Sequence, residues 1–449
     1  MNDPSPADDA PPEAPSLRSA LGYWLKLGFV SFGGPAGQIA LMHEELVVRR
    51  RWISEQRFLH ALNYCMVLPG PEAQQLATYI GWLMHRTAGG IVAGGLFVLP
   101  SFFILVGLSW VYMAYGTVPA IAGLFYGIKP AVTAIVVFAA YRIGSRALGN
   151  AWLWAIAAAA FVSVFAFDLP FPVVVVAAGI VGFFGSRVAP HRFTAGGGHA
   201  KSGHVLGPAL IDDHTPTPAH ARFTWARCAR VVTVAFASWA VTLAALVARF
   251  GSDAVLPRMG WFFTKAAFLT FGGAYAVLPY VFQGAVTEHG WLTAAQMIDG
   301  LALGETTPGP LIMVVAFVGF AGGWTKAVFG PDALFLAGVA AAAVVTFFTF
   351  LPSFFFIFLG GPFIESTHGN LRLTAPLTAI TAAVVGVIVN LAVFFASHVL
   401  WPAGLAGRFE WPAALIGTAA AVALFRFRIG VIPVVVASGL AGLAIASIH

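Results

Sequence analysis

The stretch KLGFVSFGG, residues 26–34, recurs as KAAFLTFGG at residues 265–273, which is an offset of 239 residues. The tripeptide PGP at 69–71 recurs at 308–310 with the same offset and without a gap. Two matches at one offset indicate that the chain is an internal duplication.

Later landmarks support the duplication. LPSF at 99–102 recurs at 351–354, and FPVVVVAAG from Phe171 recurs as IPVVVASG from Ile432. We expect a disordered tail, a first repeat, a polar linker, an unpaired transmembrane helix and a second repeat, at residues 1–17, 18–187, 188–228, 229–250 and 255–449.

The composition places both repeats in a membrane. The chain of 449 residues is 59% hydrophobic and 9% charged, whereas soluble domains carry about 25% charged residues. The apolar runs have the length of spanning helices and lack the alternation of barrel strands. We therefore predict an all-α polytopic membrane protein with about thirteen hydrophobic segments, and the tail lacks the features of a cleavable signal peptide.

The first two segments of each repeat contain helix breakers. Gly33-Gly34-Pro35 and Pro69-Gly70-Pro71 divide segments 18–48 and 54–85 into halves of about 14 residues. Such a half is about 21 Å long, too short for a hydrocarbon core of about 30 Å. Each broken segment is therefore either a re-entrant hairpin or one discontinuous spanning helix.

The distribution of basic residues among the loops favours re-entrant hairpins. With hairpins, the cytoplasm contains the basic linker together with Arg49-Arg50-Arg51, Arg86, Arg142 and Arg146. The unpaired helix then carries the chain across, so the second repeat is inverted and the C-terminus is periplasmic. Glu288-His289-Gly290 replaces the arginine cluster there, and Arg426 and Arg428 return to the cytoplasmic side, whereas Lys326 and Arg408 are exceptions. Inverted repeats are typical of secondary transporters.

The breaks are candidate binding sites, because irregular backbone within a membrane is tolerated only inside protein or beside a cavity. We expect Pro35, Pro71 and Pro310 at the first position of the helix that follows each break. Helix starts there expose N–H groups and the positive end of a dipole, which suit an anion. Lys26 and Lys265 precede the repeated FGG by equal spacing; they either bind the anion or extend to the interface. The candidate substrate-binding residues are Lys26, Gly33, Gly34, Pro35, Gly70, Pro71, Gln74, Lys265, Gly272, Gly273, Thr306, Thr307, Gly309 and Pro310.

Acidic residues also lie at the breaks. Glu72 follows the first PGP and Glu305 precedes the second. Each can carry a proton or balance a lysine, and Glu72 can alternatively complement the dipole of its own helix. Lys129, in another apolar run, either faces the pathway or ends a helix.

Other kinds of site have little support. The five histidines of the linker follow no ligand spacing, so we expect no metal, and Cys65 and Cys228 form no redox motif. No nucleotide-binding motif occurs, and the net charge of +6 suits membrane orientation better than nucleic acid. We expect no enzyme and no cofactor.

The repeated pattern, SFGGPAGQIA with LPGPEAQQLATYIG and TFGGAYAVLPYV with GETTPGPLIMVVAFVGF, resembles the chromate ion transporter family, in its long two-domain members. The resemblance implies a bacterial inner-membrane protein that exports chromate and confers resistance, with sulfate as the structural analogue. Ala274 departs from the pattern, because it replaces the proline of FGGP. Transport of sulfate or another oxyanion, an anion channel and assembly as a homodimer remain open alternatives.

Overall fold

In this computed structural model the described residues are 12–32, 34–188, 208–212, 215–216, 218–271, 273–367, 374–404 and 406–447. Within these ranges the chain is helical, apart from an isolated bridge between Ile53 and Ile211. The predicted all-α class is therefore confirmed. Gly33, Gly272, the first eleven residues and four of the five linker histidines lie outside the described residues.

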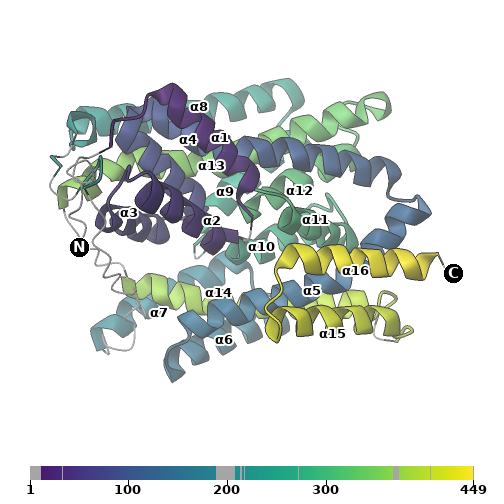
Figure 1. Cartoon of the computed structure of the whole chain (residues 1–449). Helices are drawn as coiled ribbons and strands as arrows, with labels where there is room; N and C mark the ends of the chain where they lie inside the picture. The colour runs from purple at the N-terminus through teal and green to yellow at the C-terminus, as the bar shows by residue number, and fades with distance from the viewer. Residues whose placement is uncertain are drawn as a thin grey trace, which may run out of the picture.

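The first half begins with short helices and continues with long ones (Figure 1). Its elements are α1 (Leu17–Val30), α2 (Gly34–His43), the π-helix η2 (Glu44–Arg49), α3 (Glu55–Val67), α4 (Glu72–Tyr115), α5 (Pro119–Ala147), α6 (Ala151–Phe167) and α7 (Phe171–Val188).

After the linker, η4 (Ala219–Ala221) and α8 (Trp225–Phe250) lead into the second half, which repeats the order of the first. Its elements are α9 (Val255–Leu269), α10 (Ala274–Phe282), η5 (Gln283–Glu288), α11 (Ala294–Thr306), η6 (Leu311–Met313), α12 (Val314–Thr325), η7 (Pro331–Ala333), α13 (Leu334–Thr367), α14 (Thr374–Leu400), α15 (Trp411–Phe425) and α16 (Val431–Ala446). Six described helices are long and apolar enough to cross a membrane: α4, α5, α7, α8, α13 and α14.

Equivalent residues form equivalent local structure in the two halves. Ser54 caps α3 by accepting from the Arg57 N–H, and Thr293 caps α11 by accepting from the Gln296 N–H, each at 3.2 Å. A hydroxyl at this position satisfies a backbone donor that the helix leaves unpaired. Both π-helices also lie at the 239-residue offset, so the duplication extends to irregular backbone.

The broken segments are interrupted at the predicted breakers, and the second turns back on itself, because Arg57 of α3 and Tyr79 of α4 both bond to Glu365. α1 and α2 are separated at residues 31–33, and α3 and α4 at 68–71. Within α4, His85 and Arg86 leave helical geometry, with Arg86 at φ 57°. Gly81 lies against Gly89 and Ala93, so the chain reverses at this kink and the two parts of α4 pack antiparallel.

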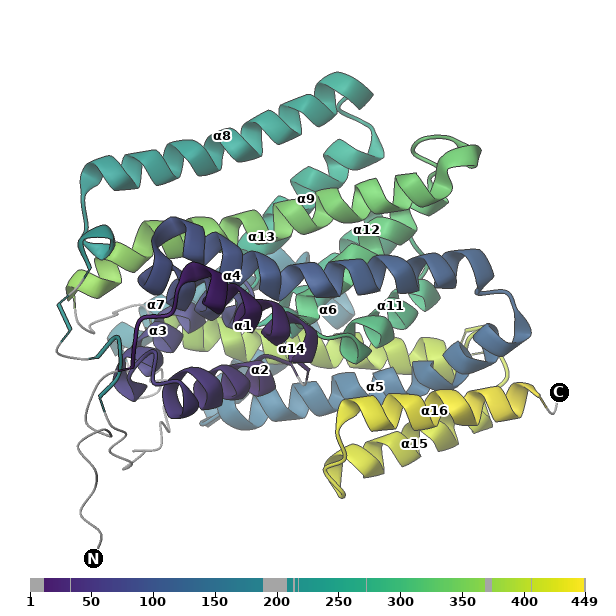
Figure 2. The same cartoon turned by 45° about the horizontal axis from the view of Figure 1, so that its top comes forward.

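The helices form two layers with the short broken helices between them (Figures 1 and 2). In one layer α4 packs against α1, α12 and α13, and α13 also packs against α8 and α9. Gly90 faces Phe358 and Gly94 faces Phe354, so the equivalent helices α4 and α13 run antiparallel. Antiparallel equivalents are the arrangement that inverted halves require.

In the other layer the halves exchange their terminal hairpins. α5 of the first half packs against α15 and α16 of the second, and α14 of the second half packs against α6 and α7 of the first. Small residues permit the close approach: Gly127 lies against Gly442 between α5 and α16, and Gly182 lies against Ala379 between α7 and α14.

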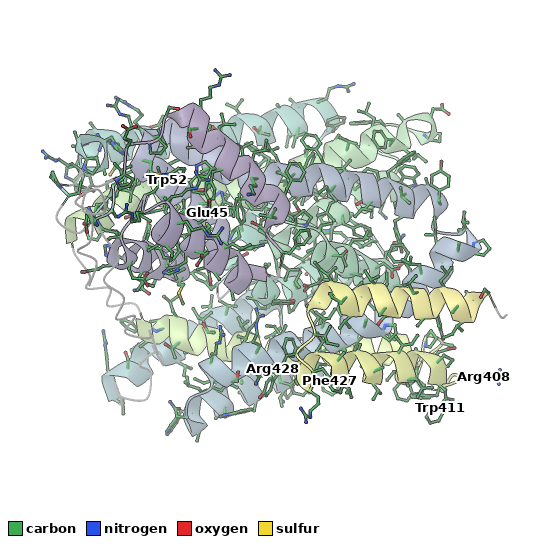
Figure 3. All side chains as sticks on the ribbon, viewed as in Figure 1. Glu45, Trp52, Arg408, Trp411, Phe427 and Arg428 are labelled. Carbon is green, nitrogen blue, oxygen red and sulfur yellow. The ribbon has the colours of Figure 1, made fainter. Side chains whose placement is uncertain are left out.

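The terminal hairpins consist of shorter helices than α5 and α14. α15 and α16 have 15 and 16 residues, about 22–24 Å of helix. In Figure 3, Arg408 lies at the end of the molecule near the C-terminus and Arg428 about midway along it. The turn between α15 and α16 thus stops short of the opposite end. α15 and α16 thus form a hairpin of two short helices, and the placement of Arg426 and Arg428 on the cytoplasmic side stays a prediction.

Candidate functional site

The four breaks meet in two pairs, and each pair joins the two halves. The Gly309 N–H donates to the Ser31 carbonyl at 2.9 Å, and the Gly70 N–H donates to the Thr270 carbonyl at 2.7 Å. Ser31 matches Thr270 and Gly70 matches Gly309 at the 239-residue offset, so the two bonds are pseudo-symmetric. We call them the Ser31–Gly309 pair and the Gly70–Thr270 pair.

Side chains complete the Ser31–Gly309 pair. The buried Gln38 Nε2 donates to the Gly309 carbonyl at 2.6 Å and to the Ser31 carbonyl at 3.2 Å. The Ser31 hydroxyl donates back to the Leu27 carbonyl at 2.5 Å. Backbone acceptors freed by the break are therefore satisfied inside the protein, as a membrane interior demands.

The Gly70–Thr270 pair has related bonds. The Gln75 Nε2 donates to the Pro69 carbonyl at 2.8 Å, and the Thr270 hydroxyl donates to the Ala266 carbonyl at 2.7 Å. Ala266 is the equivalent of Leu27. Gln38 and Gln75 are not equivalent positions of the repeat. The two pairs therefore have equivalent backbone hydrogen bonds but different supporting side chains.

Glycines at the breaks have backbone angles that other residues rarely adopt. Gly34, Gly70, Gly273 and Gly309 have φ values of 72°, 130°, 95° and 99°. Positive φ costs little for glycine alone. These conformations explain why glycine occupies all four breaks, whereas proline occupies only three.

The prolines lie close to the predicted positions. Pro35 is inside the first turn of α2, while Pro71 and Pro310 are the cap residues directly before α4 and η6. We predicted Pro71 and Pro310 at the first helical position, and each helix starts one residue later.

Two serines that the sequence interpretation did not include lie beside the glycines. A Cβ on Gly309 would lie 3.0 Å from the Ser101 Oγ, and a Cβ on Gly70 would lie 2.6 Å from the Ser353 Oγ. Both serines are buried, and neither hydroxyl has a hydrogen-bond partner among the described residues. They come from the repeated LPSF motif, which we had treated only as a landmark of the duplication.

Lys26 and Lys265 have exposed side chains on α1 and α9, among exposed apolar residues such as Phe29 and Trp261. The buried stripes of these helices lie on other faces. The structure shows no hydrogen bond or ion pair between either lysine and a described break residue.

The remaining predicted residues are three neutral hydrogen-bonding side chains and two glutamates. The Gln74 Nε2 donates to the Thr78 hydroxyl, and the hydroxyls of Thr306 and Thr307 donate to backbone carbonyls of α11, so these groups already have partners. Glu72 is partly buried in the first turn of α4. Glu305, in the last turn of α11, accepts a hydrogen bond from Tyr275.

Arg142, which the sequence interpretation used only for orientation, extends from α5 toward this region. A guanidinium nitrogen lies 3.9 Å from the position of a Cβ on Gly34, and the charge acts on Glu305 and Tyr275. The side chain is partly buried and forms no ion pair within the described ranges. It is therefore a cation beside the Ser31–Gly309 pair.

Outside the breaks, the described residues hold no cluster of His, Cys, Asp and Glu that suits a metal ion. The prominent polar contacts elsewhere are buried ion pairs. Arg57 binds Glu365 at 2.7 Å between α3 and α13, and Lys129 lies 3.4 Å from Asp299 between α5 and α11. Lys129 is thus inside a helix and does not end one.

Comparison with known proteins gives consistent matches across both halves. The family model described as "Chromate transporter" matches residues 19–183 and 257–443. The "Chromate transport protein" of Pseudomonas aeruginosa is 32% identical, with 98% of this chain and 96% of that protein covered. The protein of the same name from Cupriavidus metallidurans is 28% identical, with 95% and 94% covered. The "Probable chromate transport protein" of Synechococcus elongatus is 29% identical, with 83% of each covered. No solved structure matches the chain significantly.

Proposed function

Because the chain belongs to the chromate transporter family, we propose that it carries chromate outward across the bacterial inner membrane and so confers resistance. The observation that carries this proposal is the pairing of four membrane breaks between inverted halves. Discontinuous helices that meet at a repeat interface are where secondary transporters bind their substrates.

The geometry of the breaks suits a tetrahedral oxyanion. Helix starts and positive-φ glycines bring backbone close to a ligand, and such starts favour negative charge. Ser101 and Ser353 add two buried hydroxyls whose protons are free to turn toward an oxygen. Arg142 adds a full positive charge beside Gly34.

Lys26 and Lys265 have a more distant role in this proposal. Their exposed side chains attract the dianion electrostatically, and contact with it requires α1 and α9 to move. Sulfate, which has the same shape and charge, is the expected competitor.

The membrane potential is a sufficient driving force for the outward direction. Moving one elementary charge is worth about 2.3 kcal/mol per 100 mV. A dianion leaving a negative interior therefore gains about twice that amount.

The test is uptake of chromate by everted membrane vesicles, in which export appears as accumulation. Ser101→Ala and Ser353→Ala each remove one hydrogen bond to a charged ligand, so we expect transport affinity to fall roughly tenfold to a hundredfold. Ser186→Ala, an exposed serine of α7 that bonds its own helix, is the matched control and should leave transport unchanged.

Lys26→Ala and Lys265→Ala are compared in the same vesicles, and their double variant should lose transport at normal protein level. Full transport by the double variant would show that Lys26 and Lys265 are not needed for chromate transport. Vesicles of the unchanged protein that accumulate no chromate would contradict the proposed function itself.

A further inference from the structure

Asp299 is a buried carboxylate in the middle of α11, away from the breaks. Its side chain is 2% exposed. The Tyr112 hydroxyl of α4 donates to the Oδ2 atom at 2.7 Å, and the Lys129 Nζ of α5 lies 3.4 Å from the same oxygen. The Oδ1 atom is buried and has no hydrogen-bond partner among the described residues. A buried carboxylate with one bare oxygen depends on its cation to remain charged.

Lys129 is less enclosed than its partner. Its side chain is 30% exposed, and the 3.4 Å separation is longer than a usual charge-assisted bond. Tyr126 precedes it by three residues, so the two are neighbours on one face of α5. Tyr126 lines an open groove of about 510 Å³ together with Glu410 and the end of α16. Lys129 therefore lies about one helical turn from the groove lining, and its side chain is partly exposed.

The position of Asp299 links it to the substrate site. It precedes Thr306 by seven residues, about 10 Å along α11, and α11 leads directly into the Pro308-Gly309-Pro310 break. The Lys129–Asp299 pair therefore lies on the same helix that leads into the break.

Few other charges act on Asp299. The helices packed against α11 are α4, α5, α12, α14 and α16. α12 and α16 contain no ionisable residue, and the histidine of α14, His398, bonds its own helix near the end. On α4 and α5 the groups that face Asp299 are Tyr112 and Lys129. Arg142 acts on Glu305, farther along α11.

We propose that Lys129 and Asp299 form an oxyanion–proton site: the oxyanion takes Lys129 from Asp299, and the Asp299 carboxylate then takes up one proton. This inference rests on the proposed transport of chromate. In the protein without substrate, the Asp299 carboxylate is the negative partner of Lys129. When the dianion binds Lys129, Asp299 loses its counter-charge inside the protein.

The charges balance without a redox step. One O–H bond forms on Asp299, the proton comes from solvent, and the oxyanion remains intact. The bare Oδ1 is the oxygen that takes the proton, because Oδ2 keeps the hydrogen bond from Tyr112. Each oxyanion bound is therefore accompanied by one proton, and Asp299 releases that proton when Lys129 returns to it.

The experiment is isothermal titration calorimetry of the purified protein with chromate and, separately, with sulfate, in two buffers of different ionisation enthalpy. The difference in heat gives the protons taken up per anion bound. We expect close to one for the unchanged protein after correction for protonation of the free anion, and close to zero for Asp299→Asn. Glu410→Gln, which removes a carboxylate at the same groove, should keep the uptake.

The outcomes separate the two proposals. Binding of chromate without proton uptake by the unchanged protein overturns the oxyanion–proton site and leaves the proposed function intact. Absence of binding to the unchanged protein, together with absence of transport in vesicles, contradicts the proposed function. Absence of proton uptake by the unchanged protein overturns the inference even where Asp299→Asn does not fold. Uptake that persists in a folded Asp299→Asn protein overturns the assignment to Asp299.

Discussion

At the scale of single residues, Gly70 and Gly309 are the positions of the site that can least accept a side chain. Each has positive φ, donates its N–H to the opposite half and lies against a serine of the repeated LPSF motif. A side chain at either position meets unfavourable backbone angles and a nearby serine at once.

Gly70→Ala and Gly309→Ala should therefore abolish chromate transport and lower the free energy of unfolding by at least about 1–2 kcal/mol. Transport in vesicles and thermal unfolding in detergent measure the two effects. Gly95→Ala on α4 is the matched control, because a Cβ there meets nothing within 4 Å. Equal loss in the control would show that transport is sensitive to any added methyl group.

The repeat predicted where the site residues lie along the chain, but not which side chains face the breaks. KLGFVSFGG and PGP identified all four breaks, and their meeting across the halves follows from inversion. Which side chains face the breaks depends on how each helix is rotated about its own axis. Lys26 lies on the exposed face of α1, whereas Ser101 faces Gly309 from α4. Sequence periodicity is weak evidence for rotation in α4, which is apolar on all sides.

At the scale of elements, each re-entrant helix contacts the long helix of the other half at equivalent positions. Arg57 of α3 binds Glu365 of α13, and Gln296 of α11 donates to the Met113 sulfur of α4 at 4.0 Å. Both contacts follow the offsets of the repeat. One end of the protein thus has a buried ion pair where the other end has a weak neutral contact.

Removing one partner of the ion pair leaves a buried charge, so Arg57→Gln and Glu365→Met alone should each destabilise the protein by about 3–5 kcal/mol. The double variant reproduces the neutral contact of the other half, and we expect it to recover much of that stability. Thermal unfolding of the two single variants and the double variant measures this. A double variant as unstable as the sum of the singles would show that the two residues are not coupled.

The element boundaries were predictable where a breaker or a cap occurs, and less so elsewhere. Glycine and proline identified the breaks, and Ser54 and Thr293 identified two helix starts. The reversal at His85 and Arg86 contains neither glycine nor proline at the turn itself, although it had been placed correctly between apolar segments. The exchange of terminal hairpins between halves had no local signal, because it depends on contacts between residues far apart in the chain, such as Gly182 with Ala379 and Gly127 with Gly442.

At the scale of the whole molecule, the antiparallel course of α4 and α13 predicts that equivalent loops face opposite sides of the membrane. Arg49 and Glu288 are equivalent by the repeat, and both side chains are exposed. Single cysteines at these positions, in a Cys228→Ser background, should react with an impermeant reagent from opposite sides. Cys65 is buried and should remain unreactive. Labelling of both positions from one side would refute inverted halves.

The exchanged hairpins also set the order in which the protein can be completed during synthesis. α5 emerges from the ribosome long before α16, yet the face of α5 that carries Gly123 and Gly127 is covered only when α16 packs on it. Until then a surface shaped for close helix contact is open to lipid and to the translocation machinery. The first half therefore stays incomplete until α16 has been synthesised, and a chain that stops before α16 leaves this face of α5 without its partner.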